Sequence, residues 1–461
     1  MINSNEPIRD AKTLGTGKML VLGLQHMFAM FGATVLVPII TGLSVSVTLL
    51  FAGLATLFMH FVTGKKVPVF LGSSFAFLGG YAAVVAAGDQ YGLTQAQSLP
   101  YACVGVACAG LLYLVLAAVC KAYGSKKIIR FFPPVVTGPI IIAIGMNLAP
   151  SAINNCAANW GIALVAIVVV IVCNIWGKGM VKIIPILLGV IASYLVAAIT
   201  GNVDWTAFKE AAWIGFPIKG EETVFSLIGN CDSGLLLSSI ITIVPIAVAT
   251  MMEHVGDISA ISSTVGENFI EDPGLHRTLI GDGVGTTIAA LFGAPANTTY
   301  GENTGVLALT KVYDPFVIRL AAIYAIVLSF CPKFAALVTC MPSATIGGVS
   351  LILYGMISAV GVRNMVENHT DFQKSRNVIV AAIIIGLTIG INFSGSLGAA
   401  ITPEMGNAAT GAISFSIGSA QVNLSGLAVA SIVGIVLNAI LPDKHESEET
   451  DSKLSGSLGK Y

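Results

Sequence analysis

The feature that most constrains this chain is a long series of apolar stretches separated by short polar ones. A helix that crosses a bilayer needs ~20 apolar residues. Only 10% of the 461 residues are charged, whereas a soluble domain has about 25%. We therefore predict an all-α polytopic membrane protein. The expected segments number fourteen and lie near residues 19–37, 43–63, 67–86, 101–121, 134–148, 161–176, 181–200, 235–256, 278–292, 297–309, 315–331, 334–360, 378–391 and 427–441.

Composition and motifs exclude several classes of protein. The net charge of -1 argues against a nucleic-acid partner, which needs a basic surface. The eight cysteines are scattered without a metal-like CxxC pair, so we expect neither a metal nor a cofactor. The sequence has no GxSxG, Walker A or HExxH motif. A membrane enzyme and an ATP-driven pump are therefore disfavoured, and no catalytic residue is expected.

The basic residues predict the orientation of the chain in the cell membrane. With the N-terminus in the cytoplasm, only Lys209, Lys219 and Lys333 of the 23 Lys and Arg residues fall on the opposite side. Cytoplasmic loops are enriched in Lys and Arg, so both termini are expected in the cytoplasm. Residues 1–17 are then a cytoplasmic tail, 201–234 an extracytoplasmic loop, and 443–461 a disordered cytoplasmic tail.

The stretch from Ala294 to Lys311 is too short and too polar for an ordinary lipid-facing helix. It begins with a proline, continues with Asn-Thr-Thr, and places Glu302 between a glycine and an asparagine. We interpret it as a half-helix with an irregular start at membrane depth. Such backbone is tolerated only where protein buries it or where it lines a wet cavity. The sequence therefore predicts that a small polar solute binds here.

A second interrupted segment near Pro68 matches the first one in position. The offset between Pro68 and Pro295 is 295 − 68 = 227 residues, and the same offset relates Phe75 to Glu302. It also relates His26 to Glu253. Seven segments on each side of the 201–234 loop would enter the membrane in opposite senses. We therefore expect two inverted repeats, residues 18–200 and 235–442, with the binding site at their broken segments.

Four acids lie in apolar surroundings and need a reason to be there, because an Asp at a helix centre costs ~2.5–3.5 kcal/mol or more. Glu253 and Asp257 are i,i+4 neighbours and share one helix face. Together in a low dielectric they favour retention of a proton, as a proton-coupled site requires. Glu302 is the third candidate. Asp282 lies between two glycines, and it is either functional or ties helix ends together.

Other polar residues in these segments have two interpretations each. His26 is either a proton carrier or a hydrogen-bonded interior residue. Ser74 and Phe75 offer a hydroxyl, a backbone amide and an aromatic face to a solute, although Phe75 could simply pack. His254 points about 100° away from Glu253 on an ideal helix, so we expect it to be structural.

The motif NTTYGENTGVLALTK resembles the signature of the nucleobase/ascorbate transporter (nucleobase:cation symporter-2) family, Q/E-N-x-G-x-x-x-x-T-R/K/G. GLQH, LGSSFAF and EHVGD also look like patterns of that family, and the resemblance extends from residue 18 to about residue 442. Glu302 stands where xanthine and urate transporters typically have Gln. In this respect the chain is similar to bacterial uracil–proton symporters.

The resemblance implies a core domain, residues 18–122 and 235–332, that moves against a gate domain, residues 123–200 and 333–442. It also implies that Glu253 and Glu302 bind the pyrimidine edge. Backbone amides at Phe75 and Gly301 would add contacts, and Tyr300 and Tyr354 would enclose the ring. A homodimer formed through the gate domains is a further implication.

The expected function is proton-coupled uracil import by alternating access. Proton coupling is assigned to Glu253, Asp257, Glu302 and His26. Some relatives have His where this chain has Asp257, so their proton pathway cannot be transferred unchanged. The alternatives are a proton-coupled xanthine or urate transporter and a channel-like facilitator. An inorganic-anion exchanger is disfavoured, because two acids would repel an anion.

Overall fold

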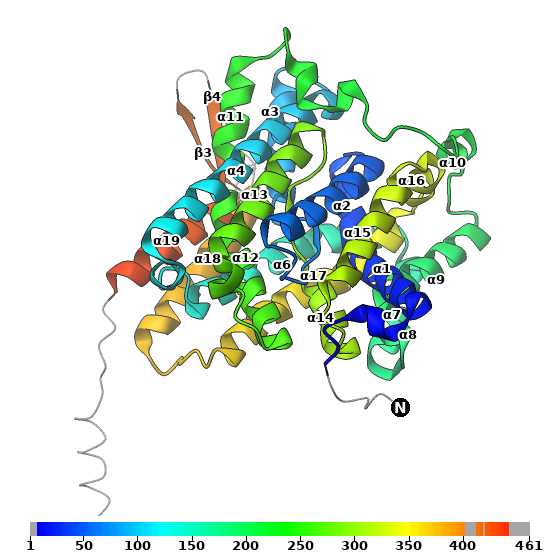
Figure 1. Ribbon diagram of the computed structural model, residues 1–461. Coiled ribbons are helices and arrows are strands. Elements are labelled where there is room, and N and C mark those ends of the chain that lie inside the picture. Colours follow the sequence, from blue (N-terminus) through cyan, green and yellow to red (C-terminus); the bar gives the residue numbers. More distant parts are fainter. Residues whose placement is uncertain (1–6, 402–411, 418–419, 442–461) are drawn as a thin grey trace, which may run out of the picture.

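The computed structural model describes residues 7–401, 412–417 and 420–441, which are almost entirely helical (Figure 1). The helices of the first part are α1 (Thr16–Thr41), α2 (Val45–Val62), α3 (Leu78–Gln90), α4 (Gln95–Tyr123), α5 (Ser125–Ile129), α6 (Pro134–Ala157), α7 (Trp160–Trp176), α8 (Met180–Ile183), α9 (Pro185–Ile199) and α10 (Thr206–Glu210). Those of the second part are α11 (Ser233–Ile243), α12 (Ile246–Val265), α13 (Leu275–Leu291), α14 (Gly301–Thr310), α15 (Pro315–Ser329), α16 (Pro332–Thr339), α17 (Ser343–Glu367), α18 (Ser375–Ile401) and α19 (Gly426–Ile440).

Many of these helices have the length and composition of membrane spans. In the described part of the chain, seven spans qualify, or eight if α15 and α16, which bend by 89° at their junction, count as one. The shorter helices α7, α9 and α19 are also apolar. The protein is therefore an all-helical polytopic membrane protein, as its apolar stretches predict.

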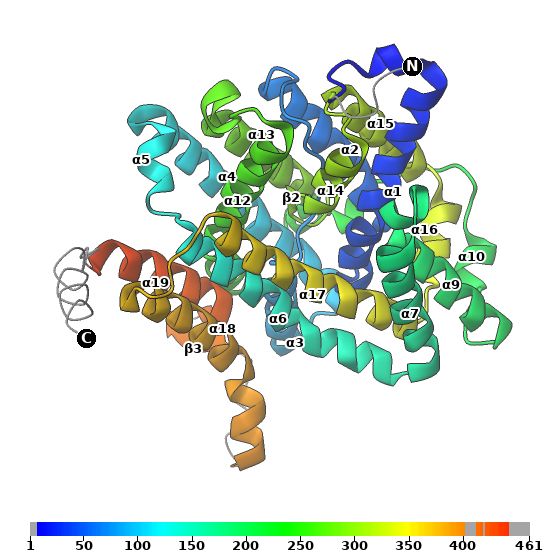
Figure 2. The ribbon, with the colours of Figure 1, turned by 90° about the horizontal axis from the view of Figure 1, so that it is seen from below.

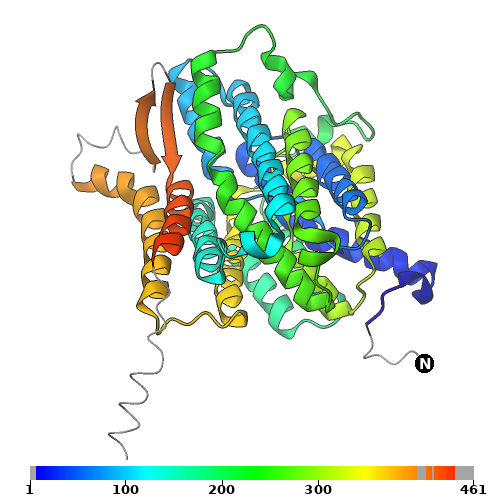
Figure 3. The ribbon, with the colours of Figure 1, turned by 60° about the vertical axis from the view of Figure 1, so that its left-hand side comes forward.

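The helices pack into two groups. The first helix group contains α1–α4 and α11–α15, and the second contains α6, α7, α9 and α17–α19. In Figure 3 the second group's α18 and α19, in orange and red, lie at one edge of the molecule. Small residues allow close approach within a group, as membrane helices require. A Cβ on Gly361 of α17 would lie only 2.6 Å from the carbonyl oxygen of Gly138 on α6.

Two three-residue strands meet at the centre of the molecule. Strand β1 (Leu71–Ser73) pairs antiparallel with β2 (Asn297–Thr299), so that Gly72 lies opposite Thr298. Each strand leads into a short helix, β1 into α3 and β2 into α14. Figure 2 shows β2 and α14 lying between α12 and α1. The pairing supplies hydrogen-bond partners to backbone N–H and carbonyl groups, which lipid cannot supply.

The strands form the non-helical starts of the segments near residues 67–86 and 297–309, which the sequence analysis interprets as interrupted. Pro68 and Pro295 precede the two strands, and neither has a backbone N–H. The residues that follow them pair with each other as β1 and β2 instead of forming helical hydrogen bonds. Gly72 permits this pairing, because Tyr300 packs where its Cβ would be. The hydroxyl of Tyr300 in turn donates to the carbonyl oxygen of Ser73 over 3.0 Å.

Several expected segments have different limits in the structure. The segment predicted at 334–360 is divided into α16 and α17, and Pro342 lies at the start of α17. The segment predicted at 235–256 is interrupted between α11 and α12, where Pro245 precedes α12. The segment at 181–200 becomes α8 and α9. In each case a proline ends the run of helical hydrogen bonds.

The region 392–425, between the last two expected segments, contains the end of α18 and a hairpin. Strands β3 (Ala412–Ile417) and β4 (Ala420–Ser425) pair antiparallel, and β4 leads into α19. Residues 402–411, 418–419 and 442–461 lie outside the described part, and so does the predicted disordered tail, 443–461.

The described part of the N-terminal tail is attached to the helical body. Ile8 forms a parallel bridge with Val312, just after α14. Arg9 forms an ion pair with Glu267, just after α12. The backbone N–H of Ala11 donates to Asp314 over 2.8 Å. This segment therefore connects the ends of the two helices that carry the candidate acids.

Candidate functional site

A cavity of about 330 Å³ lies between the two helix groups. The first group contributes α1, α12, β2 and α14 to its wall, and the second contributes α6, α7, α9 and α17. Its lining includes Phe28, Ala29, Phe75, Ile141, Ile144, Asn174, Lys182, Pro185, Ile186, Glu253, Asp257, Thr298, Thr299, Tyr300, Gly301, Glu302, Gly305, Val306, Met356, Ile357, Val360 and Arg363. This volume suits a small solute.

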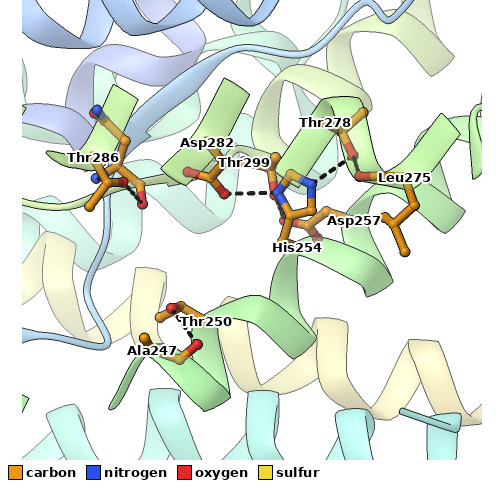
Figure 4. Close-up of polar contacts among 10 residues, drawn as sticks. Ala247, Thr250, His254, Asp257, Leu275, Thr278, Asp282, Thr286 and Thr299 are labelled. Atoms are coloured by element: carbon orange, nitrogen blue, oxygen red, sulfur yellow. Dashed lines mark hydrogen bonds and ion pairs between the residues drawn. The ribbon is translucent and has the colours of Figure 1, made fainter. Parts of the chain in front are cut away.

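Three carboxyl groups face this cavity. Glu253 and Asp257 extend from one face of α12, as their i,i+4 spacing predicts. Glu302 lies in the first turn of α14, close enough to interact electrostatically with the other two. The hydroxyl of Thr299, on β2, donates to Asp257 (Figure 4). These three residues form one acidic wall of the cavity, carried by α12 and by α14, which follows the paired strand β2.

The N-terminus of α14 supplies hydrogen-bond donors to the same wall. Its N-cap residue, Tyr300, makes no side-chain capping bond in the described structure. The first backbone N–H groups of a helix have no partner within the helix. A Cβ at Gly301 would find no described atom within 4 Å, so the backbone is open to the cavity there. The site combines carboxyl groups with backbone donors, which suits a ligand with both N–H and carbonyl groups.

Not all residues singled out from the sequence line the cavity. Glu253, Asp257, Phe75, Tyr300, Gly301 and Glu302 do. Ser74 is fully buried behind the wall, where its backbone N–H donates to Ala296. Tyr354 is 1% exposed and packs edge to face on Phe75.

His26 is fully buried and lies beside α14 instead of facing the cavity. The Nδ2 group of Asn303 lies 3.2 Å from Nδ1 of His26 and donates to its backbone carbonyl oxygen over 3.1 Å. The side chain of Asn303 thus attaches the helix of Glu302 to α1. The sequence motif contains this asparagine, but its partner could be found only from the structure.

His254 and Asp282 form a separate buried pair behind the acidic wall (Figure 4). The Nδ1 atom of His254 lies 2.8 Å from Oδ2 of Asp282, and Nε2 lies 3.0 Å from the hydroxyl oxygen of Thr278. Both side chains of the pair are 0% exposed. This pair connects α12 to α13, in agreement with the structural interpretation of His254.

Sequence reasoning missed the apolar roof and the mouth of the cavity. Ile144 and Met356 of the second helix group face the acids, but their sequence context is that of any apolar helix. Lys182 and Arg363 line the cavity and are exposed, so the cavity reaches the surface there. Among the described residues, no group of three or more His, Cys, Asp or Glu side chains is arranged to hold a metal ion.

A helical membrane protein with a solute-sized cavity lined by acidic residues has the features expected of a transporter, and comparison with known proteins identifies it as one. A model described as a permease family matches residues 17–397. The uracil permease of Bacillus caldolyticus is 37% identical over 96% of this chain and 97% of its own length. The probable uracil permease of Haemophilus influenzae is 37% identical over 94% and 96%. The putative pyrimidine permease of Escherichia coli is 37% identical over 85% and 87%.

Solved structures resemble the fold at low sequence identity. The transmembrane domain of a cyanobacterium bicarbonate transporter, BicA, aligns with a TM-score of 0.57 at 13% identity, over 94% of this chain and 99% of that one. The murine Solute Carrier 26 member A9 anion transporter in the inward-facing state gives 0.56 at 11%, over 92% and 67%.

The chain belongs to this permease family, which is the nucleobase/ascorbate transporter family that its motifs resemble. It is a membrane transporter and not an enzyme.

Proposed function

We propose that this protein imports uracil together with protons, as a secondary-active symporter. The main observation in support is that Glu253, Glu302 and the uncapped N-terminus of α14 face one cavity of about 330 Å³. Uracil presents N–H donors alternating with carbonyl acceptors. Carboxyl groups complement the N–H groups, and the partial positive charge of a helix N-terminus complements a carbonyl. The uracil and pyrimidine permeases among its relatives support this substrate class.

The remaining cavity residues suit the faces of a flat ring. Phe75 lines the same cavity as the acids and packs against Tyr354, and Tyr300, the N-cap residue of α14, also lines the cavity. Backbone N–H groups at Phe75 and Gly301 are the proposed additional donors. Ser74 is too deeply buried to touch a ligand in this conformation, so its role is limited to supporting the wall.

For the architecture we infer fourteen segments in two inverted repeats. The described part supports this count: seven long spans, the bent α15–α16 pair, the apolar helices α7, α9 and α19, helix α13, and two strand-plus-half-helix segments. The antiparallel pairing of β1 with β2 fits a two-fold relation between halves. The first helix group corresponds to the proposed core domain and the second to the gate domain, through which a homodimer would form.

The basic residues at the mouth of the cavity support the proposed orientation. Lys182 and Arg363 lie at this mouth, and positive charge concentrates on the cytoplasmic side of membrane proteins. The cavity is thus open to the cytoplasm, and both termini lie on that side of the cell membrane. Alternating access requires that the core and gate domains then rock to close this mouth and open the other side.

Proton coupling is assigned to the acidic wall. Glu253 is the proposed proton carrier, because Asp257 and Glu302 stand near it and a shared proton relieves their repulsion. Asp257 accepts a hydrogen bond from the hydroxyl of Thr299 on β2. Its proposed role is therefore to couple protonation of the acidic wall to the position of this strand. His26 faces Asn303, so it would act on Glu302 only through α14.

Uptake into proteoliposomes tests the proposal. An imposed inward proton gradient should drive accumulation of labelled uracil, and an ionophore that collapses the gradient should abolish accumulation. Glu302→Gln should weaken equilibrium uracil binding by at least tenfold, as loss of a charged hydrogen-bonding partner requires. Uracil uptake that ignores the gradient would contradict proton coupling, and unchanged binding by Glu302→Gln would remove this residue from the site.

A purine is the second candidate substrate, because the cavity volume leaves room for a two-ring base. Competition of unlabelled xanthine and urate with labelled uracil separates the two. We expect little competition, since Glu302 occupies the position at which xanthine and urate transporters typically have Gln. Saturable uptake and counterflow distinguish a carrier from a channel-like facilitator.

A further inference from the structure

A second, smaller cavity of about 70 Å³ lies behind the first. Phe75 and Ile144 line both cavities, so their side chains form the wall between them. Its other lining residues are Ala76, Gly79, Gly80, Asn147, Leu148, Ile246, Asn392, Ser425, Gly426 and Leu427.

The second cavity lies farther from the mouth marked by Lys182 and Arg363. Along α6, Ile141 and Ile144 line the first cavity, while Ile144, Asn147 and Leu148 line the second. One helical turn therefore leads from one cavity to the other. The order at the start of α3 is the same, since Phe75, just before this helix, lines both cavities, and Gly79 and Gly80 line only the second. The two cavities thus follow one another along a single path through the molecule.

The lining of the second cavity includes polar side chains but no charged one among the described residues. It contains the carboxamides of Asn147 and Asn392, and no Asp, Glu, Lys, Arg or His is among its described lining residues. The Oδ1 atom of Asn147 is buried without a hydrogen-bond partner in the described structure. A buried polar atom without a partner is costly, by ~1–3 kcal/mol. Such an atom calls for a ligand or an ordered water.

The N-terminus of α19 adds donors to this cavity. Gly426 and Leu427 begin the helix, and Ser425 caps only the N–H of Ala428, over 3.3 Å. Carboxamides and the first N–H groups of a helix, which have no partner within the helix, together match an uncharged ring with N–H and carbonyl groups. A proton or an inorganic cation would bind better at the carboxyl groups of the first cavity than at these uncharged groups.

We propose that this second cavity is the outer access site, through which the nucleobase reaches the cavity of Glu253 and Glu302. Asn147 accepts a hydrogen bond from a ring N–H there, and Phe75 with Ile144 separates the two sites. The volume of about 70 Å³ is large enough for a few waters but too small for a nucleobase in the present conformation. The site enlarges when α6, α18 and α19 move away from α3. This inference rests on the proposed function.

The test compares entry from outside with equilibrium binding. Asn147→Leu keeps the size of the side chain and removes its polar atoms. Asn154→Leu makes the same change at an exposed position of α6 and is the control. Uracil uptake is measured in cells that lack other uracil carriers, and the dissociation constant is measured on purified protein. We expect the KM of uptake to rise at least fivefold in Asn147→Leu, with a dissociation constant within twofold of wild type, and no change in Asn154→Leu.

Two results would overturn the inference. An unchanged KM would show that entry does not use Asn147, and a parallel loss of equilibrium binding would assign Asn147 to the central site. Asn147→Ser, which keeps an acceptor, should have an intermediate KM, and it carries the test if Asn147→Leu does not fold. Failure of the wild-type protein to bind uracil would instead overturn the proposed function.

Discussion

Phe75 and Tyr354 meet edge to face, with ring centroids 5.6 Å apart and planes at 76°. Phe75 lies between β1 and α3 in the first helix group, and Tyr354 lies on α17 in the second. Aromatic pairs in this geometry contribute about 0.5–1.5 kcal/mol beyond their burial. The contact therefore holds the two groups together beside the cavity and positions the ring that separates it from the second cavity.

Tyr354→Phe and Tyr354→Ala test this contact. The ring of Tyr354 makes the contact with Phe75, so Tyr354→Phe should keep uracil affinity within twofold. Tyr354→Ala removes the edge that orients Phe75 and should weaken binding by about 3–10-fold, as the energy of an aromatic pair implies. Isothermal titration of the purified variants measures both. Equal affinity of Tyr354→Ala and wild type would show that Phe75 needs no such support.

Gly301→Ala tests the site without disturbing the fold. A Cβ at Gly301 has no described neighbour within 4 Å, because it stands in the cavity. The methyl group should therefore reduce uracil affinity by about 10-fold or more, the usual effect of one methyl group in a pocket. Gly386→Ala on α18 also meets open space, away from the cavity, and should leave binding unchanged. A normal affinity in Gly301→Ala would mean that the ligand does not approach α14.

Gly72→Ala should act on stability instead. Its Cβ would collide with the ring of Tyr300 and lie 2.8 Å from the Thr34 hydroxyl oxygen. Overpacking of this kind typically costs about 1–3 kcal/mol. Thermal unfolding in detergent should therefore show a lower midpoint for Gly72→Ala than for Gly301→Ala. A midpoint equal to that of wild type would indicate that β1 and β2 can separate without cost.

Variants at Asp282 decide between its two interpretations. Leaving a buried polar group without its hydrogen-bond partner typically costs about 1–3 kcal/mol, so Asp282→Ala, which leaves His254 unpaired on this side, should unfold at a lower temperature. Asp282→Asn keeps a hydrogen-bonding group beside His254 and should lose less stability. Uracil affinity of the folded protein should stay within twofold in both. A stable Asp282→Asn protein that no longer binds uracil would give Asp282 a direct functional role.

The attached N-terminal segment makes a separate prediction. The N–H of Ile8 donates to the carbonyl oxygen of Lys311 over 2.8 Å, and Tyr313 donates back to Ile8 over the same distance. Ile8→Pro removes the first bond, which contributes about 1 kcal/mol. Amide exchange at Tyr313 should then accelerate about fivefold. Ile8→Val keeps the backbone bond and is the matched control, so equal acceleration in both would argue against the bridge.

The sequence predicts those parts of this protein that depend on local pattern. Glu253 and Asp257 face one way because helical spacing requires it, and Pro68 and Pro295 indicate both broken segments. Contacts between distant segments leave no local trace. Neither the pairing of β1 with β2 nor the bond of Asn303 to His26 follows from periodicity. Ile144 and Met356 were missed because an apolar side chain over a ligand looks like any other in a membrane helix.

The pairing of Leu71 with Thr299 also has a consequence for biogenesis. The two residues are separated by 299 − 71 = 228 positions, and their strands form one ladder. Contacts between distant positions form late, because the intervening chain must first be closed into a loop. During synthesis the first broken segment must therefore wait, with its polar backbone unpaired, until residue 299 has entered the membrane. The insertion machinery or neighbouring helices must shelter it during this interval, and the transport site is among the last parts of the molecule to assemble.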